Sequence, residues 1–143
     1  MKKFIFRLES LLKVRKVRED CVKRDLELAQ QKWRQGKEEE RSLMAQIDTL
    51  VEEMHLKRIK SQFDLQQTYS QILENLQASL NTIQMGLVTY QKGVELQKER
   101  MRQAIQARKV IEKIKEKHYT HWRTKESHME SSLADELGCH KHN

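Results

Sequence analysis

The chain has 143 residues, enough for one domain of ordinary size, and its charged share of 34% exceeds the roughly 25% of typical globular chains. The apolar share is only 37%, so little of each structural element can be buried. There is no proline and there are only four glycines, while the good helix formers Lys, Glu, Gln, Arg and Leu dominate. This composition argues against an ordinary compact core and favours long helices in an all-α protein.

The amino-terminal residues do not resemble a signal peptide, because the apolar run before Arg7 is only three residues long, from Phe4 to Phe6. No window approaches the roughly 20 apolar residues that a membrane span needs. We therefore expect a cytoplasmic protein without direct membrane insertion. Cys21 and Cys139 lie far apart in sequence, so we expect free thiols rather than a disulfide or a zinc site.

The first part of the chain carries a heptad stripe. Positions spaced alternately by four and three residues from Leu8 are apolar in ten of fourteen cases, which is typical of a coiled-coil helix. The stripe fails at Lys57, Ser61 and Asp64. Its members are Leu8, Leu12, Arg15, Glu19, Val22, Leu26, Ala29, Trp33, Gly36, Glu40, Leu43, Ile47, Leu50 and Met54.

A second stripe begins at Leu65 and slips by one residue after Leu76. We expect a second helix on this basis, starting at a capping box formed by Ser61 and Asp64 and ending at Gly138, which suits a left-handed cap. The members of the stripe are Leu65, Tyr69, Ile72, Leu76, Leu80, Ile83, Leu87, Tyr90, Val94, Gln97, Met101, Ala104, Arg108 and Ile111.

These stripes predict one domain over residues 1–143, consisting of two long helices in an antiparallel coiled-coil hairpin. The expected bounds are about 4–57 for helix one, 58–61 for the turn, 62–137 for helix two and 138–143 for a disordered tail. With the fold line near residue 60, Phe4 should face about Glu116, and helix two should extend about twenty residues beyond helix one.

The overhanging part of helix two carries Tyr119, Trp122 and Met129. Burying one such side chain stabilises by roughly 1.5 to 3 kcal/mol, so leaving them exposed suggests a docking surface. The alternative is that Trp122 caps the end of the two-helix seam.

Charge is unevenly distributed. Residues 1–34 hold 11 basic and 5 acidic side chains and residues 92–143 hold 12 and 8, whereas residues 61–91 hold no basic and 2 acidic ones. An antiparallel hairpin brings the two basic ends together, so we expect one basic tip and a neutral to acidic turn. A mixed, solvated coiled-coil surface is the simpler alternative.

The sequence lacks a phosphate loop, a nucleophile elbow and a zinc-binding cysteine pair, which argues against an enzyme and against any cofactor. His118 and His121 could share a helix face with His128 further along, but nothing completes a metal site. Nucleic-acid binding is disfavoured because acidic residues such as Glu9 and Asp20 interrupt the basic run.

Three segments resemble the FliJ family of flagellar export proteins, in the same order and across nearly the whole chain. They are Phe6-Arg-Leu-Glu-Ser-Leu-Leu-Lys-Val-Arg-Lys16, Phe63-Asp-Leu-Gln-Gln-Thr-Tyr69, and Glu112-Lys-Ile-Lys-Glu-Lys117 followed by Glu126, Glu130, Leu133, Asp135 and Glu136. One departure is Ser131 and Ser132, where the family often has a Gln-Lys pair.

The resemblance implies a stalk-like protein of the type III export apparatus, at the cytoplasmic face of the membrane at the flagellar base. Its implied partners are the hexameric export ATPase, the membrane-bound export gate protein and escort chaperones for export substrates. For the gate contact we expect Phe63, which should be exposed, and Tyr69. For the ATPase ring we expect the basic residues Arg7, Lys13, Lys16, Lys113, Lys117 and Arg123.

Two other functions fit the residues alone. The first is a basic coiled-coil adaptor or scaffold unrelated to export, possible as a homodimer through the same stripes. The second is a nucleic-acid binder, which would show strongly salt-sensitive binding to arbitrary duplex.

Overall fold

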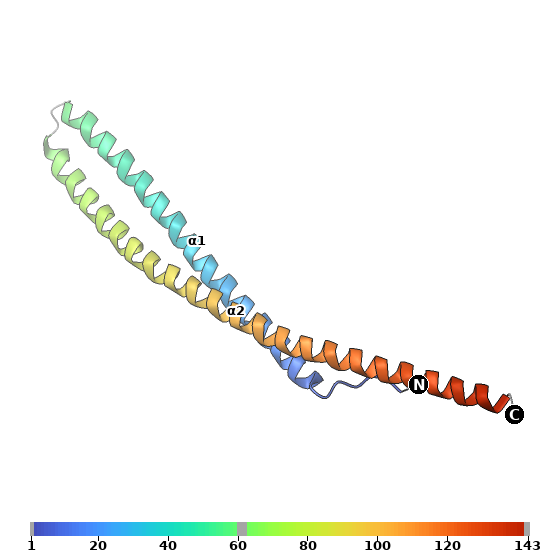
Figure 1. Cartoon of the computed structure of the whole chain (residues 1–143). Helices are drawn as coiled ribbons and strands as arrows, with labels where there is room; N and C mark the ends of the chain where they lie inside the picture. The colour runs from blue at the N-terminus through green and yellow to red at the C-terminus, as the bar shows by residue number, and fades with distance from the viewer. Residues whose placement is uncertain (1, 60–62, 142–143) are drawn as a thin grey trace. The chain divides into compact units, whose positions relative to one another are not determined.

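The computed structural model describes residues 2–59 and 63–141, and this part of the chain is helical apart from its amino-terminal segment. Helix α1 runs over Glu9–Ile59 with 51 residues and helix α2 over Phe63–Lys141 with 79 residues (Figure 1). The two helices pack against each other as an all-α hairpin, which confirms the predicted fold class. Pro is absent, and strong helix formers fill both segments, so no residue forces either helix to break.

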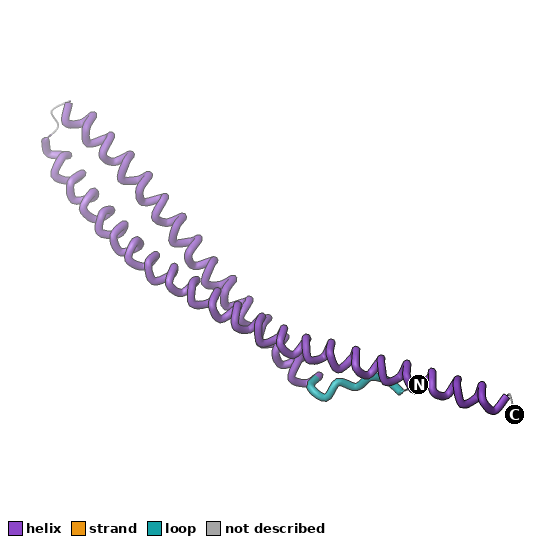
Figure 2. Tube along the Cα trace, viewed as in Figure 1, coloured by secondary structure: helices purple, strands orange, loops and turns teal. Residues whose placement is uncertain are grey.

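Three of the expected boundaries need correction. Helix α1 begins at Glu9 rather than near residue 4, because residues 2–8 form a non-helical segment (Figure 2). Residues 58 and 59, expected in the turn, are helical, whereas residues 60 and 61 and the proposed cap at Ser61 lie outside the described residues. Helix α2 continues through Gly138 to Lys141, so Gly138 does not end it and residues 138–141 are not a disordered tail.

The heptad stripe of α1 is confirmed as the surface that faces α2. All fourteen predicted positions from Leu8 to Met54 are buried or half-buried, including the polar residues Glu19 and Glu40. Leu12, Val22 and Leu50 are buried, at 2%, 3% and 8% exposure, and Gly36 is buried as well. The same spacing therefore holds along the whole of α1, since a repeat of 3.5 residues keeps one narrow stripe facing its partner helix.

The beginning of the α2 stripe was predicted in the wrong phase. Leu65 and Ile72 are each 42% exposed, whereas Gln66 and Leu73 are half-buried in their place. The side-chain amide of Gln66 also donates a hydrogen bond of 3.2 Å to the backbone oxygen of Met54 in α1. The stripe therefore runs from Gln66 through Leu73 without a slip, and the polar Gln66 hid this phase in the sequence.

Contacts divide the chain into two compact units, and the single hairpin domain stays a prediction. Unit 1 comprises Met1–Val22 with Met101–Asn143, and unit 2 comprises Lys23–Arg100. In unit 2 the helices are antiparallel, because Gly36 lies against Leu87 while Met54 meets Gln66. A Cβ atom on Gly36 would come within 2.7 Å of Leu87 Cδ2, so glycine permits close approach of the helices there.

Unit 1 has a small apolar core at the amino-terminal end of α1. Phe6, Leu12 and Ile111 are 6%, 2% and 6% exposed. The half-buried side chains around them are Phe4, Leu8, Leu11 and Ile114. Leu12 facing Ile111 and Glu9 facing Lys115 show that the helices are antiparallel here as well. This core fixes the position of the amino-terminal segment that precedes α1.

Candidate partner-binding surface

The amino-terminal segment of unit 1 lies along α2 as an extended strap, which we define as residues 2–8 (Figure 2). The backbone N–H of Glu9 donates to the oxygen of Phe6 at 3.2 Å and the N–H of Leu12 to that of Leu8 at 3.0 Å, which marks the start of the helix. The contacts of the strap with α2 keep the antiparallel order of the seam, since Phe6 meets His118 and Phe4 meets Tyr119.

Two phenylalanines attach the strap to α2. The ring of Phe4 packs edge-on against Tyr119 with centroids 5.3 Å apart, and it lies 5.7 Å from Trp122. Phe6 packs edge-on against His118 at 5.8 Å. Tyr119 and Trp122 stack on each other at 5.9 Å. We call these five rings the aromatic clasp, because they close the end of the α1–α2 seam.

The aromatic clasp corrects our prediction for the overhang. Phe4 faces Tyr119 and Trp122 rather than Glu116, so these two aromatic residues do have an intramolecular partner. The alternative that Trp122 caps the seam is confirmed. Met129 remains 59% exposed, and it lines a shallow groove together with Lys2, Trp122, Lys125 and Leu133. Only the part of α2 beyond Trp122 therefore keeps an exposed apolar surface of the kind that we expected.

The acidic side chains near the seam of unit 1 form ion pairs across or along it. Glu9 Oε2 lies 2.8 Å from Lys115 Nζ. The hydrogen bond from Lys115 lowers the pKa of the Glu9 carboxyl, burial opposes this, and the charges of Lys115, Lys13 and Lys16 add to the lowering. This pair joins the first turn of α1 to α2.

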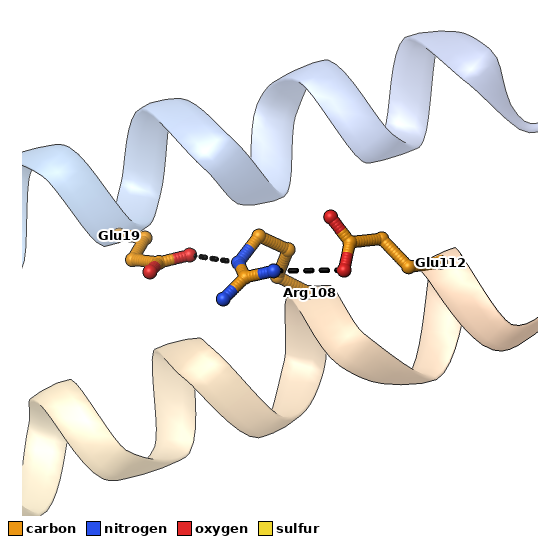
Figure 3. A network of polar contacts seen from close by, with 3 residues as sticks. All are labelled: Glu19, Arg108 and Glu112. Atoms are coloured by element: carbon orange, nitrogen blue, oxygen red, sulfur yellow. Dashed lines mark hydrogen bonds and ion pairs between the residues drawn. The ribbon is translucent and has the colours of Figure 1, made fainter.

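A second ion-pair network lies further along the seam. Arg108 donates through Nε to Glu19 Oε2 of α1 and through its NH1 nitrogen to Glu112 Oε2 at 2.8 Å (Figure 3). The hydrogen bonds to Glu19 and then Glu112 raise the pKa of the Arg108 guanidinium, so the group stays charged. The sequence analysis placed Arg108 and Glu19 on the stripes but did not identify their pairing.

Basic side chains therefore dominate the outer surface of unit 1. Unit 1 contains 16 basic and 9 acidic side chains, and three of the acidic ones, Glu9, Glu19 and Glu112, are already in ion pairs. All six residues predicted to face the ATPase ring belong to this unit and are exposed. They are Arg7, Lys13, Lys16, Lys113, Lys117 and Arg123.

These six residues come from the strap, from α1 and from α2, and we define the basic surface as these six residues. Exposed charges of one sign can attract and orient an acidic partner. The basic surface does not resemble an active site, where a few groups converge on one reacting atom.

The two residues predicted to contact the export gate lie in unit 2. Tyr69 is half-buried and occupies the seam stripe of α2. The side chain of Phe63 lies outside the described ones, so its predicted exposure stays a prediction. Both residues lie in the stretch 61–91, which contains no basic side chain.

Metal-binding chemistry does not emerge from the described residues, because no three His, Cys, Asp or Glu side chains come together there. His118 instead packs against Phe6. Cys21 and Cys139 are free, exposed thiols, as expected. In the described ranges neither α1 nor α2 includes a stretch apolar enough to cross a bilayer.

An all-helical hairpin in which one unit carries an excess of basic side chains is typical of coiled-coil proteins that act through contacts with partners. Comparison with known proteins identifies the family. The model of the flagellar FliJ protein family matches residues 3–143, and the chain belongs to that family. Neither the curated proteins nor the solved structures include a match to this chain. Family membership gives the chain a role related to flagellar protein export and implies interactions within the export apparatus, which disfavours an unrelated adaptor.

Proposed function

We propose that this protein is a non-catalytic, cytoplasmic stalk of the flagellar export apparatus that binds the export ATPase ring through unit 1. It would promote assembly of the ring, couple it to the export gate at the membrane and escort substrate chaperones. The observation that supports ring binding is the excess of basic side chains in unit 1. The acidic residues Glu9 and Glu19 of its seam already form ion pairs within the chain.

The basic surface would act by long-range attraction and orientation. Exposed charges that are not held in tight pairs raise the rate of association with an oppositely charged partner, and salt screens this attraction over roughly 10 Å at 0.1 M. Binding to acidic loops of a ring should therefore weaken as the salt concentration rises. The ion pairs of the seam would be screened less by salt, because they lie between the two helices.

A charge-reversal variant tests this proposal. All six residues of the basic surface are changed to Glu, and binding to the purified export ATPase of the same organism is measured at two salt concentrations together with ATPase stimulation. A matched control reverses six exposed basic residues of unit 2, namely Lys23, Arg24, Lys32, Arg58, Lys92 and Arg100. We expect a loss of affinity of at least tenfold and a flatter salt dependence only in the unit 1 variant.

The two variants distinguish binding through the basic surface from attraction by the net charge of the whole chain. Equal losses in both variants would mean that total charge alone drives the interaction. Unchanged affinity in the unit 1 variant, with helicity and melting temperature preserved, would remove the basic surface from the proposal.

For the contact with the export gate we propose Phe63 and Tyr69. Their support is their place at the start of α2, in a stretch without basic residues and therefore distinct in charge from unit 1. A Phe63→Ala variant should bind the ATPase normally but reduce export. The control is Ile72→Ala, which truncates another apolar side chain of α2 that is 42% exposed. Export at the normal level in the Phe63 variant would remove this residue from the gate contact.

A further inference from the structure

Arg108 and Glu19 are charged residues at positions that a coiled coil normally fills with apolar side chains. Both belong to the heptad stripes, and their neighbours on those stripes, Val22, Ala104 and Ile111, are 3%, 7% and 6% exposed. The side chains of Arg108 and Glu19 are only 22% and 18% exposed. Figure 3 shows the guanidinium of Arg108 between the two helices, directed towards Glu19 on α1 and Glu112 on its own helix.

The apolar residues of the seam do not by themselves select one alignment of the helices. Leu and Ile recur at heptad spacing along α1 and α2, so a slip by seven residues again places apolar side chains opposite apolar side chains. Such a slip moves one helix by about 10 Å along the other. In unit 1, replacing one leucine or isoleucine of the seam by another as the opposite residue changes the buried area and volume only modestly. In unit 2 the close approach of Gly36 to Leu87 also depends on the alignment.

The Arg108–Glu19 pair does distinguish the alignments. A slip by one heptad carries Glu19 about 10 Å away from Arg108, whereas Glu112 stays in place because it belongs to the same helix as Arg108. The slipped state would therefore leave Glu19 in the seam without its cation. Leaving one member of such a pair without its partner is costly even where the intact pair adds little stability.

The same pair disfavours association of two copies through their stripes. In a parallel pair of identical helices each stripe residue faces its own copy, so Arg108 would face Arg108 and Glu19 would face Glu19. Like charges at such a position are unfavourable. An antiparallel pairing of α1 with α2, as in the hairpin, brings Arg108 and Glu19 to an opposite charge.

We propose that Arg108 and Glu19 are positioning residues that fix the register of the α1–α2 hairpin in unit 1. By fixing the register they hold Phe4 and Phe6 opposite Trp122 and His118, and they align the basic side chains of α1 with those of α2. This role concerns the hairpin itself and holds whether or not the basic surface binds an ATPase ring.

Distances between spin labels test the register directly in the full-length protein. Cys21 and Cys139 are changed to Ser, and labels are attached to cysteines introduced at the exposed positions Val14 and Thr124. These positions are offset along the helix axis, so a slip of one heptad changes their separation by nearly its full axial length of about 10 Å. Pulsed electron paramagnetic resonance then reports the alignments that are populated.

The test variant is Glu19→Leu with Arg108→Leu, which makes both stripe positions apolar. We expect it to remain helical with an unchanged or higher melting temperature, yet to show a second label distance that the parent lacks. A purely stabilising pair would instead lower the melting temperature and leave one distance. A single distance identical to that of the parent, in a folded variant, would overturn the proposal.

Two further variants serve as controls for the register proposal. Glu40→Leu is the matched control, since Glu40 is also a half-buried stripe residue but pairs at 3.5 Å with Lys37 on its own helix, and it should keep a single distance. The reversed network Glu19→Arg, Arg108→Glu and Glu112→Arg should restore a single distance. If the double-leucine variant fails to fold, Glu19→Gln takes its place, and one unchanged distance in that variant would equally overturn the proposal.

Discussion

Phe4 and Trp122 lie with their ring centroids 5.7 Å apart, although 117 residues lie between them in the sequence. The contact continues the antiparallel order of the seam, in which Glu9 meets Lys115 and Phe6 meets His118. The strap and α2 therefore close the seam together, and the groove beside Met129 begins where this closure ends.

Removing the Phe4 ring should loosen the aromatic clasp. Phe4→Ala eliminates contacts with Tyr119 and Trp122, and aromatic pairs contribute roughly 0.5 to 1.5 kcal/mol beyond their buried area. In a Trp33→Phe background Trp122 is the remaining tryptophan, so its fluorescence emission should shift to longer wavelength. The control is Ile5→Ala, at a neighbouring residue that is 85% exposed. An unshifted emission in the Phe4 variant would contradict the clasp.

The core of unit 1 should depend strongly on Leu12. Its side chain is 2% exposed and packs with Phe6 and Ile111, so Leu12→Ala removes buried methyl groups and leaves a cavity. Substitutions of this kind destabilise by about 2 to 5 kcal/mol. Chemical unfolding followed by circular dichroism measures the change. Val14→Ala, at a position 63% exposed, should change the unfolding free energy by less than about 0.5 kcal/mol. Similar effects of both substitutions would argue against this core.

The pairing of Glu9 with Lys115 should make stability depend on pH in the acidic range. The pKa of Glu9 is lowered from its ordinary value of 4.5, chiefly by the hydrogen bond from Lys115. A carboxyl with a lowered folded-state pKa stabilises above its unfolded value and loses this contribution as pH falls through the folded value. The stability difference between the parent and Glu9→Gln should therefore be present at pH 6 and fade below about pH 4.5.

A partner variant checks this assignment. In a Lys115→Met background, Glu9→Gln should change the unfolding free energy much less at pH 6, since the hydrogen bond to the carboxylate is already lost. An equal effect of Glu9→Gln in both backgrounds would show that Lys115 is not the partner that matters.

Two helical glycines should respond differently to alanine. A Cβ on Gly93 meets no atom within 4 Å, so Gly93→Ala should stabilise through helix propensity by up to about 1 kcal/mol. At Gly36 the same atom would lie 2.7 Å from Leu87 Cδ2, so the gain should be smaller or reversed. Thermal unfolding of both variants measures the difference. A larger stabilisation at Gly36 than at Gly93 would contradict the close approach of the helices there.

Periodicity and charge in the sequence determined much of this protein. The stripe from Leu8 to Met54 fixes the buried face of α1, because heptad spacing admits only one phase over so many turns. The charge counts also identified basic residues near both chain ends, which an antiparallel hairpin brings together. Both features are properties of residue spacing and composition along the chain, so they can be predicted before the fold is known.

Tertiary contacts decided what did not repeat. Whether Phe4 continued the helix or extended along α2, whether Trp122 was covered, and whether Gln66 or Leu65 entered the seam each depended on which residue of one helix met which of the other. The sequence places Arg108 and Glu19 on two stripes, but the distance between those stripes exists only once the helices are aligned. Helix propensity acts within one segment. The register between α1 and α2 instead results from competition among many pairings of nearly equal energy, so it is known only from the folded chain.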